Sequence, residues 1–201
     1  MYYFLSYFHV IRNLPEKREL QYVVPTGNFG DILAGYYAKR MGLPIASLVI
    51  ATNENDILTR FWRTGRYEKV SSDSTIVTSA LDSKPMVPAG GASDGKQASS
   101  EGGVKATLSP AMDILVSSNF ERLLWYLAYE TSRAAGRKAA CNVLAQWMSE
   151  VKSDGRVALP ISVLELARHD FLAERISDEQ VRFLIPADLT GLSQFFMLHL
   201  I

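Results

Sequence analysis

The stretch that decides the fold is V-V-P-T-G-N-F-G-D-I-L, residues 23–33. The run L-Q-Y-V-V over residues 20–24 is rich in β-branched and aromatic residues and is typical of a buried strand. Gly27 and Gly30 then mark a turn, and an amphipathic helical run follows over residues 31–40. This order aims backbone N–H groups and the positive end of a helix dipole at one point. The stretch therefore predicts a phosphate-binding turn.

The motif G-N-F-G at residues 27–30 is weak evidence on its own. Many strand-to-helix turns carry glycine only to make the turn, and that interpretation fits the same residues. The motif is not the G-x-G-x-x-G of dinucleotide sites, and it lacks the Lys-Ser/Thr ending of a Walker loop. We therefore expect neither a dinucleotide nor a nucleoside triphosphate at this turn.

Composition narrows the class of protein. The chain has 201 residues, of which 48% are hydrophobic, so we expect one domain, or one and a fraction. Its 21 basic residues balance 21 acidic ones, so we expect no binding of nucleic acid. The lone cysteine, Cys141, excludes an internal disulfide, and the histidines show no ligand spacing, so we expect no metal site. The apolar runs fall short of the roughly 20 residues that span a bilayer. We expect no membrane span and a cytoplasmic location.

A second apolar run, I-A-S-L-V-I-A over residues 45–51, completes a βαβ unit with the strand over 20–24 and the helix over 31–41. Such a unit implies parallel strands, so the predicted class is α/β, with a partial parallel sheet flanked by helices. The polar run T-N-E-N-D at residues 52–56 follows the second strand, at the edge where α/β proteins bind ligands. It is either a loop near the ligand or the N-cap of the next helix.

The second half of the chain has a mainly helical pattern. Ser-x-x-Glu/Gln capping boxes predict helix starts at Ser118, Ser162 and Ser177. Apolar spacings of three and four predict a buried stripe of Phe120, Leu123, Leu124, Leu127 and Ala128. The remaining expected elements are a helix over 1–11, a strand over 104–108 and helices over 118–133, 138–151 and 166–173.

Two stretches differ from the rest of the chain. Residues 82–103 are rich in small and polar residues, and we expect a mobile insertion there. Residues 181–201 form a divergent apolar tail, without charge from Leu189 onward and without an evident partner. The strongly aromatic first helix also needs a covering surface, so we expect the chain to be a piece of a longer protein.

Three long segments resemble one enzyme family. They are V-P-T-G-N-F-G-D-I-L-A-G-Y-Y-A-K-R-M-G-L-P at residues 24–44, A-T-N-E-N-D-I-L-T-R-F at 51–61 and A-T-L-S-P-A-M-D-I-L-V-S-S-N-F-E-R-L-L-W-Y-L-A at 106–128. Together they resemble threonine synthase, the fungal type in particular, in the family's own order. A weaker match continues over residues 171–180. On this resemblance, residues 1–180 are an incomplete threonine-synthase-like domain that binds pyridoxal 5′-phosphate (PLP).

The resemblance implies a fold-type-II, tryptophan synthase β-like, PLP-dependent enzyme. Its family converts O-phospho-L-homoserine and water into L-threonine and phosphate, in threonine biosynthesis. Carried over residue by residue, the loop that binds the cofactor phosphate is Gly27, Asn28, Phe29, Gly30 and Asp31. We expect Asp31 to orient the turn or cap the helix rather than to touch the phosphate.

One departure from the family pattern concerns catalysis. The family holds its cofactor on a lysine in a motif of the Ser/Thr-Phe-Lys-Asp kind, and no such motif occurs in these 201 residues. We therefore assign no catalytic residue and expect the isolated chain to be catalytically incomplete. Two alternatives stay open: a noncatalytic remnant that binds PLP or phosphate, and a related PLP-dependent dehydratase or phospholyase.

The third matched segment contains further candidates for contacts to the substrate phosphate or carboxylate. Their side chains have suitable chemistry, Arg122 above all, although helix capping or simple exposure to solvent explains the same residues. They are Ser109, Asp113, Ser117, Asn119 and Arg122.

Overall fold

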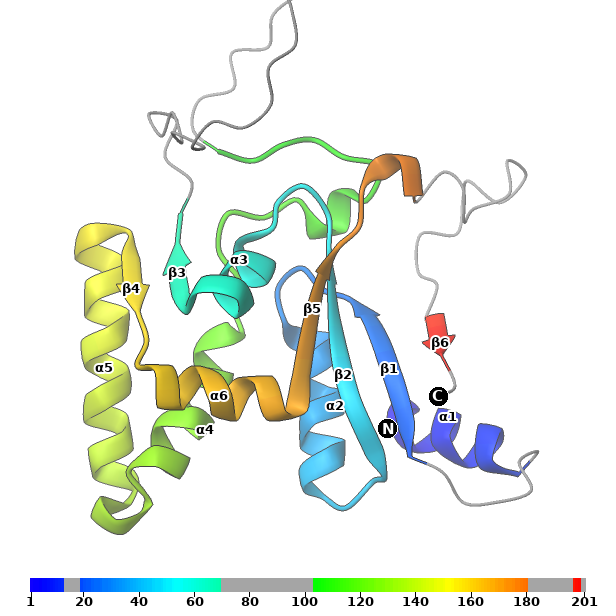
Figure 1. Ribbon diagram of the computed structural model, residues 1–201, viewed down its shortest axis with the longest axis horizontal. Helices are drawn as coiled ribbons and strands as arrows, with labels where there is room; N and C mark the ends of the chain where they lie inside the picture. Colours follow the sequence, from blue (N-terminus) through cyan, green and yellow to red (C-terminus); the bar gives the residue numbers. More distant parts are fainter. Residues whose placement is uncertain (13–18, 70–102, 181–196, 200–201) are drawn as a thin grey trace, which may run out of the picture.

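The computed structural model describes residues 1–12, 19–69, 103–180 and 197–199 (Figure 1). The predicted insertion over 82–103, except its last residue, and most of the predicted tail lie outside the described residues. The elements are α1 (Tyr2–Ile11), β1 (Leu20–Pro25), α2 (Gly30–Arg40), β2 (Ile45–Thr52), α3 (Ile57–Thr64), β3 (Arg66–Glu68), η1 (Pro110–Met112), α4 (Phe120–Thr131), η2 (Arg133–Ala135), α5 (Gly136–Asp154), β4 (Arg156–Ala158), α6 (Ile161–Asp170), β5 (Phe171–Arg175) and β6 (Met197–His199).

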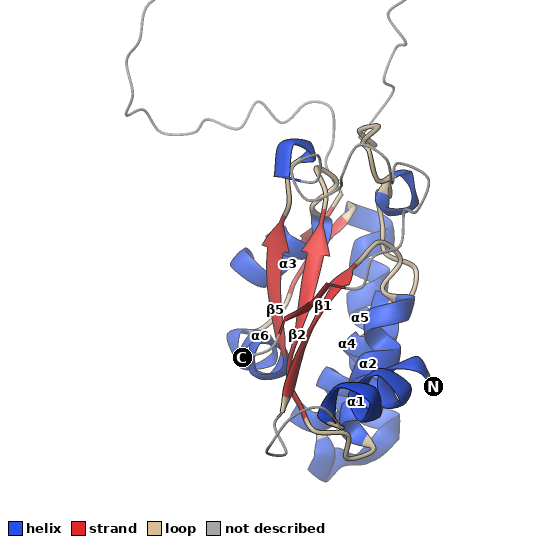
Figure 2. Ribbon diagram, turned by 90° about the vertical axis from the view of Figure 1, so that its right-hand side faces the viewer, coloured by secondary structure: helices blue, strands red, loops and turns tan. Residues whose placement is uncertain are grey.

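The main sheet has the strand order β5-β2-β1-β6. Strand β2 runs parallel to both β1 and β5, which confirms the predicted βαβ unit and the α/β class. Strand β6 pairs antiparallel with β1, so part of the predicted tail lies at the edge of this sheet. Figure 2 shows the strands as a narrow layer with α1 and α2 on one side of it.

A separate antiparallel pair, β3 and β4, connects the two halves of the chain. Helices α4, α5 and α6 lie beyond the β5 side of the main sheet, and α1 lies at the β1 side (Figure 1). The predicted stripe on α4 is confirmed, because Phe120, Leu123, Leu124, Leu127 and Ala128 are all buried.

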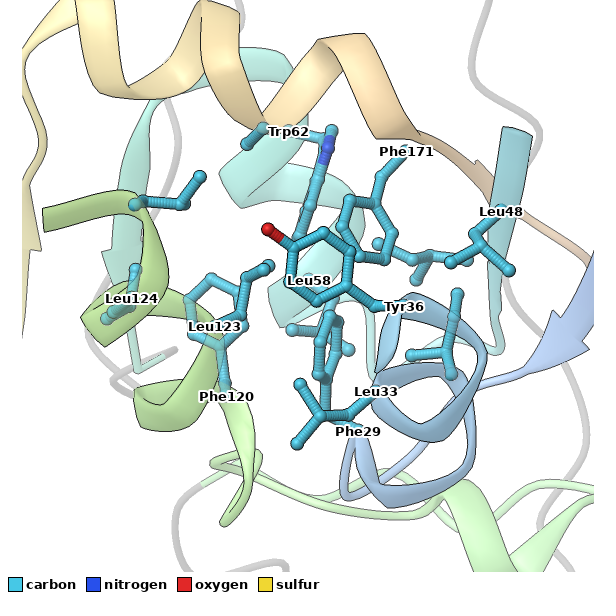
Figure 3. Packing of buried hydrophobic residues seen from close by; sticks show 14 of the residues in the cluster. Phe29, Leu33, Tyr36, Leu48, Leu58, Trp62, Phe120, Leu123, Leu124 and Phe171 are labelled. Atoms are coloured by element: carbon cyan, nitrogen blue, oxygen red, sulfur yellow. The ribbon is translucent and has the colours of Figure 1, made fainter. Parts of the chain in front are cut away.

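The core is built around an aromatic cluster (Figure 3). Phe29 lies between Trp62, Phe120 and Phe171, with ring centroids 6.2, 5.3 and 5.9 Å away. Tyr36 contacts Phe171 from α2, at 5.3 Å. These rings come from the glycine turn, α2, α3, α4 and β5, so burying them joins all the parts that surround the turn.

The prediction of a helix over 166–173 is wrong at its end. Helix α6 stops at Asp170, and Phe171 is extended, with φ −129° and ψ 141°. Phe171 pairs with Leu48 of β2 and is 1% exposed. The burial of this ring against the sheet outweighs the local helical pattern, as tertiary packing often does.

The capping boxes at Ser118 and Ser162 are also wrong. Helix α4 begins after Asn119, and α6 begins after Pro160. The third box is confirmed: the Ser177 N–H donates to Gln180 Oε1 at 2.9 Å, and the Gln180 N–H donates to Ser177 Oγ at 3.3 Å.

The strand predicted over 104–108 does not form. The Lys105 N–H donates to Asn55 Oδ1, and the Lys105 carbonyl accepts from Asn55 Nδ2, both at 2.8 Å. Val104 and Leu108 are 41% and 47% exposed, so they bury too little surface to hold a strand against the sheet. This backbone is bound by side chains instead of a neighbouring strand.

Candidate phosphate-binding loop

The glycine loop leaves the carboxyl end of β1 and enters α2. The Thr26 N–H donates to the Ala51 carbonyl of β2 at 2.8 Å, and Thr26 Oγ1 donates to the Val24 carbonyl at 2.6 Å. These bonds fix the start of the loop at the edge where β2 also ends. Ligands of α/β proteins bind at this edge of a parallel sheet.

Phe29 adopts a left-handed backbone conformation, with φ 64° and ψ 0°. This conformation is uncommon for any residue but glycine and costs roughly 1–3 kcal/mol. Burial of the Phe29 ring, which is 1% exposed, stabilises the loop in this state. A left-handed residue lets successive N–H groups converge on one point, the arrangement called an anion-binding nest.

The backbone donors of the loop have no acceptor among the described residues. Within the described part of the chain, the N–H groups of residues 27–31 donate to no acceptor, and the first N–H of α2 with a partner is that of Leu33, which donates to the Phe29 carbonyl at 3.1 Å. The carbonyls of Gly27 and Asn28, in contrast, both accept hydrogen bonds. The loop therefore offers hydrogen-bond donors, together with the positive end of α2, to an anion.

The two glycines of the loop face protein rather than open space. A Cβ on Gly27 would lie 2.8 Å from the Ala111 carbonyl oxygen and 3.2 Å from Met112 Cα. A Cβ on Gly30 would lie 3.3 Å from Asn119 Nδ2. Glycine is thus needed at position 27 because the turn at η1 approaches it too closely for a side chain.

Asp31 faces α1, away from the loop. Its carboxylate accepts hydrogen bonds from the Tyr2 and Tyr3 hydroxyls, and the Tyr3 hydroxyl also donates to the Asp31 carbonyl at 3.1 Å. Burial, followed by the nearby carboxylate, raises the pKa of Tyr3. Among the described residues, the side-chain donors to the Asp31 carboxylate come from α1, so Asp31 could offer an anion only its backbone N–H.

The five candidates of the third matched segment separate into two groups. Ser117 and Asn119 contact the glycine loop, and Arg122 donates to Asn119 Oδ1. Asp113 and the Ser109 carbonyl instead accept from Asn53 Nδ2, at 2.7 and 3.4 Å.

Asp113 is the centre of a polar clamp between two loops, which we define as Asn53, Asn55, Thr107 and Asp113. The Asp113 carboxylate accepts from Asn53 and Asn55 Nδ2 and from the Thr107 hydroxyl and N–H, at 2.7 to 3.0 Å. Of the two interpretations of residues 52–56, the helix cap is correct only in position, because Asp56 precedes α3 without a side-chain cap bond.

Metal and membrane features are not found in the described residues. No group of three or more His, Cys, Asp or Glu side chains there is arranged to hold a metal ion. Among the helices that the structure describes, none has the length and apolar character needed to cross a membrane.

Known proteins similar to this chain are threonine synthases. No protein-family model matches the chain. It is 52% identical over 180 residues to threonine synthase of Schizosaccharomyces pombe, a match that covers 89% of this chain and 31% of that protein. It is 45% identical to threonine synthase of Saccharomyces cerevisiae, over 89% of this chain and 29% of that protein.

Solved structures agree with the sequence matches. The crystal structure of threonine synthase from yeast superposes with a TM-score of 0.68 at 46% identity, over 89% of this chain and 29% of that one. A PLP-bound threonine synthase from Brucella melitensis gives 0.59 at 38% identity, over 88% and 28%. The chain spans about three tenths of the length of its curated relatives. Over this shared stretch, the chain belongs to the threonine synthase family.

Proposed function

We propose that this chain provides the PLP-phosphate loop of a threonine synthase, which forms L-threonine and phosphate from O-phospho-L-homoserine and water. The observation that carries the proposal is the set of N–H groups at residues 27–31 that have no acceptor among the described residues, beside the left-handed Phe29. The family relationship supplies the identity of the anion, since one relative of known structure is a PLP-bound threonine synthase.

In this proposal the loop binds and orients, and it does no bond-breaking chemistry. The N–H groups of Gly27, Asn28, Phe29, Gly30 and Asp31 hold the phosphate dianion at the start of α2. The bound cofactor would supply an electron sink for proton transfers and phosphate elimination. The Asp31 carboxylate stays with Tyr2 and Tyr3, which keeps its negative charge away from the phosphate.

The 201-residue chain is proposed to bind PLP without making threonine by itself. The support is the missing Ser/Thr-Phe-Lys-Asp motif. A remnant that binds PLP or phosphate without catalysis is the second candidate, favoured by the same combination of a donor-rich loop and no lysine motif. A cytoplasmic location belongs to this proposal and rests on the lone, exposed Cys141.

A titration of the purified chain with PLP, followed by borohydride reduction and mass mapping, tests the proposal. We expect saturable binding without a stoichiometric adduct at one lysine. A single reduced lysine would overturn the assignment of no catalytic residue, and absence of saturable binding would overturn the phosphate loop.

A glycine variant makes this test specific to the loop. Gly27→Ala places a methyl group against the Ala111 carbonyl, so the loop must shift and PLP affinity should fall. Gly155→Ala is the control, because Gly155 ends α5 with a positive φ, 70°, and nothing lies near its Cβ, so the added methyl group strains only the backbone there. It should lower stability and leave PLP affinity unchanged.

A further inference from the structure

Two consecutive carbonyls of the glycine loop are held from one side. Ser117 Oγ donates to the Gly27 carbonyl at 3.0 Å. The Asn28 carbonyl accepts from the Asn119 N–H at 3.1 Å and from Asn119 Nδ2 at 2.8 Å. Both donors belong to the segment that leads into α4, which lies 90 residues further along the chain.

Fixing these carbonyls also fixes the direction of two N–H groups. A peptide unit is planar and trans, so its C=O and N–H point in opposite directions. The unit with the Gly27 carbonyl carries the Asn28 N–H, and the unit with the Asn28 carbonyl carries the Phe29 N–H. Each of these N–H groups therefore points away from Ser117 and Asn119, and neither has an acceptor in the part of the chain that the structure describes.

The two holding side chains are themselves fixed. The Ser117 N–H donates to the Tyr67 hydroxyl at 2.8 Å, and Ser117 is 4% exposed. Arg122 donates to Asn119 Oδ1, which turns the amide nitrogen of Asn119 towards Asn28. Asn119 makes no side-chain cap bond to α4, so its amide has no competing role at the start of that helix.

We infer that Ser117 and Asn119 are positioning residues that aim the Asn28 and Phe29 N–H groups at the cofactor phosphate. They do so without contact to the phosphate. This inference rests on the proposed function. It separates the two residues from the other polar groups of residues 106–128, because only they hold carbonyls of the loop in the described structure.

The test compares two ligands that differ only in the phosphate. Pyridoxine 5′-phosphate and pyridoxine lack the aldehyde, so neither forms adducts with surface lysines. Calorimetry on the full chain should show that Ser117→Ala and Asn119→Ala each weaken binding of the phosphate ester about tenfold or more, the loss expected for one hydrogen bond to a charged group. Pyridoxine affinity should not change. If the two residues had a purely structural role, the affinity for both ligands would change.

Controls keep the outcomes distinct. Ser118→Ala lies between the two positions. Its hydroxyl bonds no loop carbonyl and only accepts a long bond, 3.5 Å, from Asn119 Nδ2, so this variant should bind nearly like the wild type. If buried Ser117→Ala unfolds, Asn119→Ala carries the test, with a thermal melt to confirm its fold. Variants that keep the wild-type preference for the phosphate ester would overturn this inference alone. A wild type with equal affinity for both ligands would overturn the proposed function and the inference together.

Discussion

Two loops leave the same edge of the sheet, one after β1 and one after β2, and they use their polar groups in opposite ways. In residues 52–56 the side chains are bonded to protein, with Asn53 and Asn55 held by Asp113. In residues 27–31 two of the five residues are glycine, and the backbone N–H groups have no acceptor in the described structure. The loop that is richer in polar residues is therefore the structural one, and the loop that contains a buried phenylalanine is the one that we propose for the anion.

The largest effect should come from removing the Phe29 ring, which stabilises the glycine loop. Phe29→Ala removes a buried aromatic side chain and should cost about 3–5 kcal/mol of unfolding free energy. Urea unfolding checks the value. Phe8→Ala is the control, because Phe8 is 57% exposed and its loss should change little. Equal stability of the two variants would mean that the cluster around Phe29 does not hold the loop.

Loss of the polar clamp should lower the stability of the chain and leave its ligand affinity unchanged. Asp113→Ala leaves the buried Asn53 amide, 3% exposed, without its closest carboxylate acceptor, at a cost of about 1–3 kcal/mol. The N–H groups of residues 27–31 are not bonded to the clamp, so affinity for pyridoxine 5′-phosphate should stay near the wild-type value. Urea unfolding measures the stability of this variant, and calorimetry measures its affinity for the ligand. A variant with wild-type stability and weakened binding would contradict the prediction.

Alkaline pH should destabilise the chain through Tyr67, whose hydroxyl holds Ser117 beside the glycine loop. Burial raises the pKa of Tyr67 to about 12, although the hydrogen bond from the Ser117 N–H lowers it in part. The unfolded chain releases this proton near pH 10, the ordinary value for tyrosine. The stability due to the neutral Tyr67 is therefore complete below pH 10 and is lost as the pH rises towards 12. Urea unfolding between pH 8 and 11 should show a steeper decline for the wild type than for Tyr67→Phe; parallel curves would contradict the assignment.

The smallest effect concerns the loop after β5, a third loop at this edge. Ser177→Ala breaks the capping box with Gln180 and should cost about 1 kcal/mol locally. Hydrogen exchange at the Gln180 amide should quicken, while exchange in β1 and β2 stays unchanged. Unaltered exchange at Gln180 would show that the box contributes nothing in solution.

Sequence patterns predicted the βαβ unit, the glycine turn and the buried stripe of α4, because each depends on periodicity within a short segment. Strand β5 was not predictable in this way, since Phe171 continues a helical pattern and becomes extended only by pairing with Leu48. The same limit applies to the capping boxes, where Asn119 and Pro160 precede the helices in place of the expected serines.

The candidate site, too, could be predicted only in part from the sequence. The five loop residues could be named from the sequence, and their role in binding PLP stays a prediction. The left-handed conformation of Phe29 could not be named, because phenylalanine is not a residue that favours it. The contacts of Ser117 and Asn119 join positions far apart in the chain, so no local spacing reveals them.

The contact between α1 and α2 has a consequence for evolution. The Tyr3 ring lies over Gly35, where a Cβ would come within 2.7 Å of Tyr3 Cζ. Neither position can change alone: a larger residue at 35 displaces the ring, and a smaller residue at 3 leaves a void beside the glycine. We expect the two positions to covary among relatives, with glycine at 35 retained in lineages that keep an aromatic residue at 3.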